Sequence, residues 1–167
     1  MKSASLEDLL AKDEIREVLA RLARGTDRRD PELIRSCYHA DAIDDHGAFR
    51  GSPAGFAEWV PNALGIFAST MHVLGNISIE LSGDTAHVET YCTAHHIYPP
   101  DDPGGARDNI LGLRYVDRFE RRGERWLIAK RLCVYDYSLC VPAGDAWPLD
   151  PPFTRGRPDP ADPSYEG

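Results

Sequence analysis

The sequence of 167 residues has no long apolar run and no excess of positive charge. A membrane-spanning helix needs about 18 or more consecutive apolar residues, so we expect no span. Lysine and arginine total 19 against 27 acidic residues, which gives a formal charge of −8. Such an acidic chain is poorly suited to bind nucleic acid. The first residues are charged where a signal peptide is apolar, which indicates a cytoplasmic protein.

Cysteine is scarce, and glycine-rich phosphate-binding motifs are missing. The four cysteines, Cys37, Cys92, Cys133 and Cys140, form no Cys-x-x-Cys pair, which argues against a zinc knuckle or a thioredoxin-type site. We expect free and mostly buried thiols, with a nucleophilic cysteine as the alternative. The chain has no Gly-x-Gly-x-x-Gly and no Walker motif, so the sequence predicts no nucleotide cofactor.

A long amphipathic helix is expected at the start of the chain. Apolar residues recur at intervals of three and four over residues 5–25, which is the helical period. Ser5 and Asp8 resemble a weak capping box at its beginning. Gly25 is the stop signal expected at its end.

Shorter elements follow this helix. Asp30 is placed to cap a short helix over residues 31–38. Residues 42–50 are expected to form an edge strand. A third helix should begin at Pro53, and Pro61 should kink or break it.

The second half of the chain changes to strand-type sequence. Glycines at 83 and 123 mark hairpin turns within a series of segments rich in β-branched and aromatic residues. These segments predict four strands, over residues 71–81, 84–98, 109–121 and 125–139. Helices followed by antiparallel strands predict an α+β domain over residues 1–142, with a curved sheet that forms a cone around a cavity. Residues 143–167 are expected to be an extended, proline-rich tail.

Three residues are candidates for catalysis. Asp27 follows the first helix, and a carboxylate there is more commonly a loop or capping residue. His72 lies among apolar residues of a predicted strand, with Leu74 and Asn76 on the same face by alternation. Arg131 alternates with Leu127, Ala129, Cys133 and Tyr135, so an inward position would require an anionic partner.

Other side chains are candidates for substrate binding. We expect them to line the cavity, although aromatic residues at such spacings are usually core residues. They are His46, Trp59, Asn76, Tyr91, His96 and Tyr135. His46, His72 and either His95 or His96 could also form a metal site, but no close-spaced ligand motif supports one, and we predict no metal.

The order of several short motifs resembles the SnoaL-like branch of the nuclear transport factor 2-like superfamily. The resemblance covers about residues 5–140. Its motifs are Asp13-Glu14-Ile15-Arg16, Gly25-Thr26-Asp27-Arg28-Arg29-Asp30, Asp41-Ala42 leading to Gly51, Met71-His72-Val73-Leu74-Gly75-Asn76, Phe119-Glu120-Arg121-Arg122-Gly123 and Trp126-Leu127-Ile128-Ala129-Lys130-Arg131. The resemblance implies a cone-shaped α+β barrel that assembles as a homo-oligomer, a trimer or a dimer.

The nearest functional templates in that branch are the hexachlorocyclohexane dehydrochlorinases, related in fold to scytalone dehydratases. The resemblance implies an Asp27–His72 dyad as base, with Arg131 near the leaving group. The lysine of the dehydrochlorinases falls on Leu22, which argues against dechlorination. We therefore expect a cofactor-independent lyase that dehydrates a hydrophobic hydroxylated ring or aromatic compound. The alternatives are a lyase that expels formaldehyde from a lignin-derived diaryl compound, a polyketide cyclase or ketosteroid isomerase, and a non-catalytic ligand-binding domain.

Overall fold

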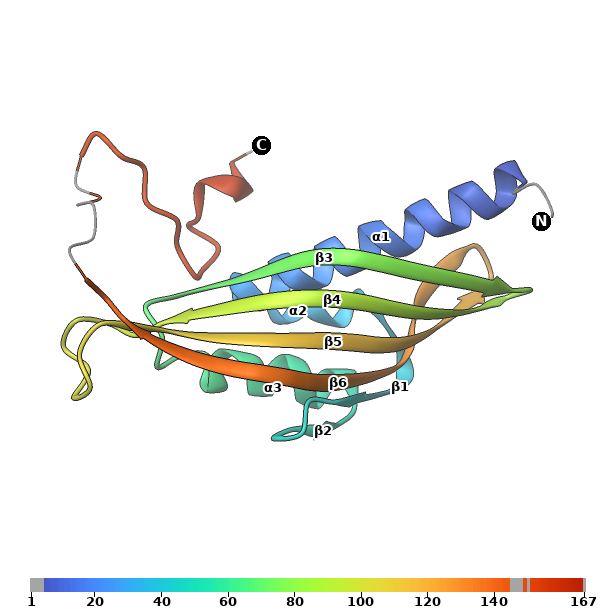
Figure 1. Cartoon of the computed structure of the whole chain (residues 1–167). Helices are drawn as coiled ribbons and strands as arrows, with labels where there is room; N and C mark the ends of the chain where they lie inside the picture. Colours follow the sequence, from blue (N-terminus) through green and yellow to red (C-terminus); the bar gives the residue numbers. More distant parts are fainter. Residues whose placement is uncertain (1–4, 145–148, 150, 167) are drawn as a thin grey trace.

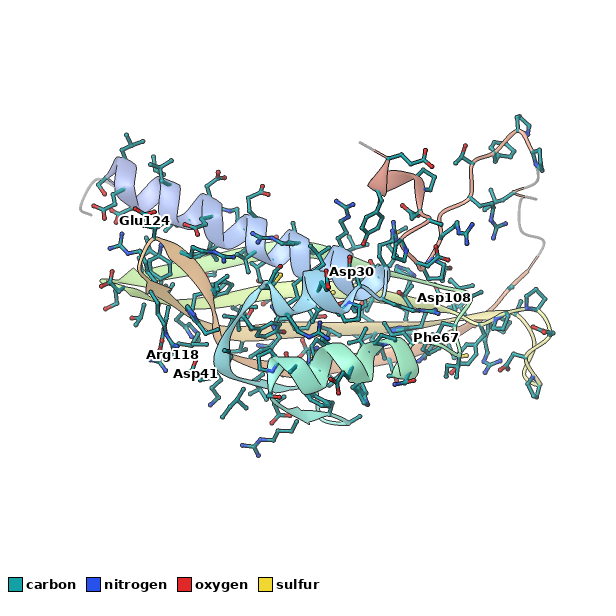
Figure 2. The ribbon with its side chains drawn as sticks, turned by 180° about the vertical axis from the view of Figure 1, so that it is seen from behind. Asp30, Asp41, Phe67, Asp108, Arg118 and Glu124 are labelled. Carbon is teal, nitrogen blue, oxygen red and sulfur yellow. The ribbon has the colours of Figure 1, made fainter. Side chains whose placement is uncertain are left out.

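A computed structural model describes residues 5–144, 149 and 151–166. Its elements follow the chain in the order α1 (Leu6–Asp27), α2 (Pro31–Arg35), β1 (Tyr38–Asp45), β2 (Arg50–Gly51), α3 (Pro53–Ala63), β3 (Ser69–Ser82), β4 (Thr85–Ile97), β5 (Arg107–Arg122), β6 (Arg125–Pro142) and the 3-10 helix η1 (Pro163–Tyr165). The strands form one sheet in the order β2-β1-β6-β5-β4-β3. The three α-helices lie against one face of this sheet (Figures 1 and 2), which confirms the α+β class.

The first helix begins where it was expected but ends later. Ser5 and Asp8 form both hydrogen bonds of a capping box. The helix does not stop at Gly25 and continues to Asp27, and Arg29 adopts the left-handed conformation, with φ 51°, beyond its end. Gly25 has a different role, because a Cβ atom there would lie 3.2 Å from the backbone nitrogen of Ile34 in α2. The glycine therefore allows α2 to pack closely on α1.

Two local predictions in the next segment are wrong. The strand expected over residues 42–50 at the edge of the sheet is β1, which lies between β2 and β6 and pairs with β6 in parallel. That pairing joins distant segments, so the local sequence does not reveal it. Pro61 does not break α3, which runs on to Ala63. Pro61 lies in the last turn, so the lost hydrogen bond and the clash of its ring affect only the end of the helix.

The four strands predicted in the second half are confirmed as β3 to β6. Gly83 and Gly123 turn the two hairpins with φ of 59° and 67°, a conformation that favours glycine. Register shifts interrupt β3 after Leu74 and β6 at Ala129, where one residue is left without a partner. Each shift reverses the alternation of side chains along the strand. As a result Arg131 shares the inner face with Trp126 and Ile128, and not with Leu127 and Ala129 as expected.

The core fills the space between the helices and the sheet. Its largest fully buried side chains include Phe119, Ile15, Leu19, Leu22, Ile34 and Ile128. All four cysteines are free, and Cys140 alone among them is exposed. No helix among the described residues is long and apolar enough to cross a membrane.

The described part of the tail returns from the end of β6 to the end of α1 (Figure 1). The backbone oxygen of Ser164 accepts a hydrogen bond of 2.9 Å from Arg24 of α1, whose guanidinium also lies over the Tyr165 ring. The hydroxyl of Tyr165 donates to Asp30 at 2.8 Å, and Arg28 pairs with Asp162 at 3.3 Å. These contacts hold the tail beside the last turn of α1.

The close packing at Gly25 can be tested by adding a side chain. We expect Gly25→Val to lower the free energy of unfolding by about 1–3 kcal/mol, because the new atoms overpack the contact with α2. Ala20→Val is the matched control at an exposed position of the same helix, where the cost is about 0.5 kcal/mol. Equal losses for both variants in urea denaturation would contradict the packing argument.

Candidate functional site

The Asp27 carboxylate joins the end of α1 to the edge strand β3. One oxygen accepts hydrogen bonds from the Thr70 hydroxyl at 2.9 Å and from Nδ1 of His72 at 2.7 Å. The other oxygen accepts the backbone N–H of His72 at 2.9 Å. The structure therefore brings Asp27 and His72 together as an Asp–His pair, within the 2.6–3.2 Å range, roughly, of catalytic hydrogen bonds.

The environment of this pair keeps Asp27 ionised. Burial raises the pKa of the Asp27 carboxyl, but the hydrogen bonds from His72 and Thr70 outweigh it and lower the pKa below its usual value. An anionic Asp27 holds the proton of His72 on Nδ1 and leaves Nε2 as the free ring nitrogen. His72 is thus oriented as a base.

A small internal cavity lies beside His72. It has a volume of about 20 Å³, enough for about one water molecule. Its walls are formed by Leu19, Leu22, Ala23, Thr26, His46, Phe56, His72, Leu74, Tyr115 and Arg131. The hollow expected inside the cone is therefore much smaller than a ring compound, because apolar side chains from α1, α3 and β3 fill it.

Arg131 points inward, and its anionic partner belongs to the protein. Its Nε and Nη2 donate to the two oxygens of Asp117 at 2.8 and 2.6 Å, and its guanidinium lies 4.0 Å from the Tyr115 ring centre. Burial disfavours the charge of Arg131, but Asp117 raises the pKa of the guanidinium well above its ordinary range. The arginine is therefore a permanent cation in the wall of the cavity.

His46 forms a second Asp–His pair at the same cavity. Its Nδ1 contacts one oxygen of Asp44, and the other oxygen accepts the Tyr38 hydroxyl at 2.6 Å. Asp44 is fully buried. The imidazole stacks on the Phe56 ring with 4.5 Å between centres, which fixes its plane. His46 is therefore as firmly oriented as His72.

The adjacent histidines of β4 point to opposite sides of the sheet. His96 is buried on the inner face, and its ring centre lies 5.8 Å from that of His72. Burial lowers the pKa of His96, which favours its neutral form. His95 faces outward, and its Nδ1 pairs with Asp108 at 2.6 Å.

The structure does not bring the remaining candidates to the cavity. Asn76 is exposed, because the register shift after Leu74 turns it away from the inner face. Tyr91 lies on the outer face of β4 and is exposed. Trp59 packs against phenylalanine rings of the core. Tyr135 is half exposed, and its hydroxyl donates to the backbone oxygen of His46 at 3.2 Å, so it supports the loop that carries His46.

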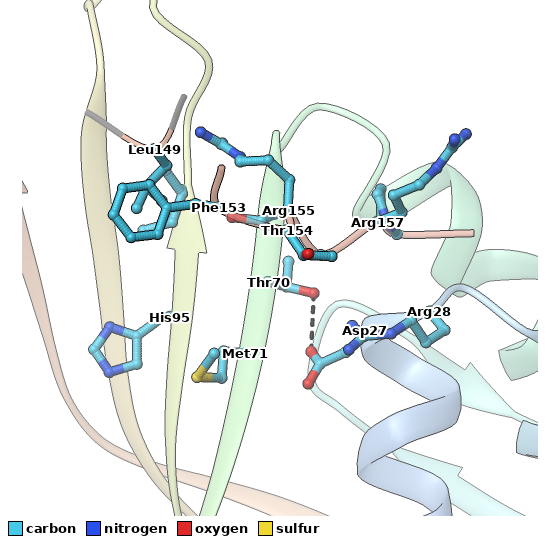
Figure 3. Close-up of a pocket in the computed structure, with 14 residues that line it drawn as sticks. Asp27, Arg28, Thr70, Met71, His95, Leu149, Phe153, Thr154, Arg155 and Arg157 are labelled. Atoms are coloured by element: carbon cyan, nitrogen blue, oxygen red, sulfur yellow. Dashed lines mark hydrogen bonds between the residues drawn. The ribbon is translucent and has the colours of Figure 1, made fainter. Parts of the chain in front are cut away.

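A larger pocket of about 470 Å³ lies on the other side of Asp27, between the edge of β3 and the tail (Figure 3). Its floor includes Asp27, Thr70 and Met71, and its outer wall includes Phe153 and Arg155 of the tail. The volume falls in the range of about 300–1,000 Å³ that is typical of small-molecule sites. Asp27 borders this pocket, whereas the ring of His72 borders the internal cavity.

Three polar residues of the site were not identified from the sequence. Asp117 alternates with Tyr115 and Phe119 along β5, which predicts a core position. An acidic residue at a core position indicates a buried cationic partner, which is Arg131. Asp44 directly precedes the loop of His46, but its burial depends on the unexpected parallel pairing of β1. Thr70 gave no signal, since a threonine is ordinary in a strand.

Metal ligands do not cluster in the described part of the chain. Among those residues no group of three His, Cys, Asp or Glu side chains is arranged to hold a metal ion. His46 and His72 both direct Nδ1 at a carboxylate and stand at the internal cavity, while His95 lies on the opposite face of the sheet.

The sequence matches the family described as SnoaL-like domain over residues 7–132. An uncharacterized protein of Mycobacterium tuberculosis is 28% identical over 133 residues, which are 77% of this chain and 87% of that protein. The family match spans the three α-helices and all six strands up to the middle of β6.

Two solved structures share the fold. The hexachlorocyclohexane dehydrochlorinase LinA-type3 from Novosphingobium barchaimii LL02 is 19% identical, with a TM-score of 0.76 over 87% of this chain and 99% of that chain. A candidate scytalone dehydratase from Novosphingobium aromaticivorans DSM 12444 is 20% identical, with a TM-score of 0.69 over 84% of this chain and 97% of that chain. At this level of identity the likeness establishes the fold only.

The contribution of the ionised Asp27 carboxylate should depend on pH. Because folding lowers its pKa, the carboxylate stabilises the fold above about pH 4, and this stabilisation is lost as the pH falls through the folded-state pKa. We expect Asp27→Asn to cost about 2 kcal/mol at neutral pH and less in acid. Unfolding free energies of both proteins across this range give the difference. Asp101→Asn, at an exposed loop position, is the control, and a pH-independent difference for Asp27→Asn would contradict the argument.

Proposed function

The chain belongs to the SnoaL-like domain family, and from that premise we propose that it is a cofactor-independent lyase of the dehydratase type. The observation that carries the proposal is the hydrogen bond of 2.7 Å between Asp27 and Nδ1 of His72, in a setting that keeps the carboxylate anionic. Such a pair provides an imidazole base whose conjugate acid is stabilised by a carboxylate.

In the proposed reaction, Nε2 of His72 removes a proton from a carbon next to the carbon that bears a hydroxyl group. The electrons of the C–H bond form a double bond, and the C–O bond breaks. Asp27 stabilises the imidazolium that results. The buried position of the pair excludes bulk water, which strengthens these electrostatic interactions.

Arg131 is proposed to stabilise the departing oxygen. Asp117 takes its Nε and Nη2, and within the described residues no partner is found for Nη1. Since Arg131 lines the cavity with His72, this remaining nitrogen is available as a hydrogen-bond donor. One such donor contributes about 3–4 kcal/mol to the stabilisation of a transition state.

We propose a hydrophobic hydroxylated ring compound as substrate. The relatives in fold carry names that describe eliminations, a dehydrochlorinase and a dehydratase. The pocket of about 470 Å³ beside Asp27 is large enough for a ring of this kind and is bordered by apolar tail residues such as Phe153. Contact with Nε2 of His72 requires Leu22, Leu74 or Phe56 to move aside, because the internal cavity has room for about one water.

Loss of the proposed base should abolish elimination. We expect His72→Ala and Asp27→Asn to lower kcat by about 10²–10⁴-fold, since each removes part of the base. The assay is mass spectrometry of a panel of hydroxylated ring compounds, which detects the loss of one water molecule. His87→Ala, an exposed histidine on the outer face of β4, is the control and should retain full activity.

Each other outcome of this assay points to a different reaction. Release of formaldehyde indicates the related carbon–carbon lyase, and a product of unchanged mass indicates an isomerase or cyclase. Folded His72→Ala and Asp27→Asn proteins with the turnover of the wild type would overturn the dyad as the catalytic base.

We further propose that the protein forms a homo-oligomer through the outer face of its sheet. Large apolar side chains are exposed there on β3, β4 and β6, where the helices do not cover them: Met71, Val73, Tyr91, Leu132, Tyr137, Leu139 and Val141. Exposed apolar patches of this extent are typical of protein–protein interfaces. The size of the patch does not fix the number of copies, a trimer or a dimer.

A charge within this patch should disrupt assembly. We expect Leu139→Lys to shift the protein to a monomer, because burial of an unpaired ammonium group in the interface is costly. Light scattering coupled to size-exclusion chromatography measures the mass. Leu10→Lys places the same charge at an exposed leucine of α1 and should leave the mass unchanged. A monomeric wild type would contradict the proposal.

The proposed site of action is the cytoplasm. All four cysteines are free thiols, and three of them are buried. Free thiols are stable in a reducing compartment, where structural disulfides are rare.

A further inference from the structure

We propose that His46 is the general acid of this site, which protonates the departing hydroxyl while His72 removes the proton from carbon. The inference rests on the proposed function and adds a second catalytic residue to it. It follows from three features of the structure: the matched orientation of the two imidazoles, their convergence on one cavity, and the charge of the buried groups around His46.

The two imidazoles are held in the same way. Each directs Nδ1 at a buried carboxylate, His46 at Asp44 and His72 at Asp27. Each carboxylate accepts a further hydroxyl on its side, from Tyr38 at 2.6 Å and from Thr70 at 2.9 Å. Both rings line the internal cavity and keep Nε2 for a ligand there.

The two rings reach the cavity from opposite ends of the sheet order. His72 lies on β3, the last strand, whereas His46 directly follows β1, which lies next to the edge strand β2 at the other end. Both imidazoles line the cavity, each contributed by a different wall, so a substrate that displaces the apolar side chains there is bordered by both. Removal of a proton and donation of a proton at neighbouring atoms require this kind of arrangement.

The charges around the two rings differ. Asp44, Arg131 and Asp117 are register partners on β1, β6 and β5, and Asp117 forms the ion pair with the guanidinium. All three are buried. With both carboxylates ionised this row has one uncompensated negative charge, which is costly in a buried position. The row thus places His46, which contacts Asp44, close to two buried carboxylates.

Among the residues that the structure describes, no such row surrounds His72. The Asp27 carboxylate and the neighbouring imidazole of His96 are its polar contacts on the inner face, and burial favours neutral His96. Arg131 is unsuited to be the acid, because a guanidinium does not release its proton in proteins. Among the described residues that line the cavity, His46 is the imidazole that contacts a carboxylate of the buried row. We therefore assign the donated proton to His46.

The step balances without a further reactant. His72 gains the proton of the C–H bond, whose electrons form the double bond. The C–O bond breaks with its electrons on oxygen, and the oxygen takes the Nε2 proton of His46 and leaves as water. Proton exchange with solvent then returns the proton from His72 and restores the one on His46.

The protonation state of His46 can be measured without a substrate. In nitrogen-15 spectra of the full-length wild type at neutral pH, we expect both ring nitrogens of His46 to carry protons, assigned by their loss in His46→Gln. The groups that face His46 are Asp44, Tyr38, Arg131, Tyr115, Asp117 and His72. Asp44→Asn should make the ring neutral. The control is His95, which pairs with Asp108 on the exposed face and should be unaffected by Asp44→Asn. A bare Nε2 of His46 in the wild type overturns the proposal.

The leaving group provides a kinetic test. The probes are β-hydroxycyclohexanone, whose hydroxyl is a poor leaving group until it is protonated, and its acetate ester, whose acetate leaves readily without a proton. We expect His46→Gln to slow elimination of water by about 10²–10⁴-fold and to leave elimination of acetate within a few fold of the wild type. His72→Ala should slow both reactions, because both require removal of the proton from carbon.

The outcomes separate the two proposals. Equal losses on both probes in His46→Gln mean that His46 supports the structure and is not the acid. Full activity of His72→Ala on both probes contradicts the proposed lyase itself. If the wild type converts neither probe, the lyase proposal fails for this class of ketone, and the nitrogen-15 measurement still decides the state of His46.

Discussion

The carboxylate of Asp27 is the point at which helix, sheet and candidate chemistry meet. An acidic residue at the C-terminal end of a helix is disfavoured by the helix dipole, yet α1 ends there and the side chain is buried. Three donors from β3 offset this cost, two of them from His72. The same contacts join the helix to the free edge of the sheet and fix the ring of His72. Function and architecture therefore depend on one side chain, and the position of α1 depends in turn on the close packing of Gly25 against Ile34.

The buried row of Asp44, Arg131 and Asp117 is a second constraint of the same kind. Buried ion pairs contribute little to stability, because loss of hydration offsets much of the attraction between the charges. Apolar residues of similar volume often replace buried ion pairs without loss of stability, so we explain the row by what it does to the cavity. It supplies a fixed cation in the cavity wall, and it includes the carboxylate of Asp44 that contacts His46. Apolar core residues surround these charges. On the inner face of β5, Phe119 follows Asp117, and on the inner face of β6, Ile128 precedes Arg131.

Much of this arrangement could be predicted from the sequence, and the failures have a common cause. Periodicity located α1 and the four long strands, and the motif resemblance singled out Asp27, His72 and Arg131, which the structure places on the inner side of the sheet. Asn76 was misplaced because a single extra residue after Leu74 reverses the side-chain alternation, and Ala129 does the same in β6. The local sequence does not indicate where an extra residue of this kind interrupts a strand. The burial of Asp44, the partner of His46, was missed because β1 joins the sheet by a parallel, long-range pairing with β6. Asp117, the partner of Arg131, was missed because it faces Arg131 only through the register of β5 with β6. Local periodicity identifies elements, whereas partners across strands depend on register.

That long-range pairing is also what gives the cavity two different walls. Without β1 beside β6, Asp44 would have no place next to Arg131, and His46 would be a loop histidine at the surface. With it, one wall has an imidazole beside a single carboxylate and the other has an imidazole beside two carboxylates and a guanidinium. Two chemically identical side chains therefore have different electrostatic surroundings. This difference between the walls fits the proposed elimination, in which one imidazole removes a proton from carbon and the other donates a proton to the departing oxygen.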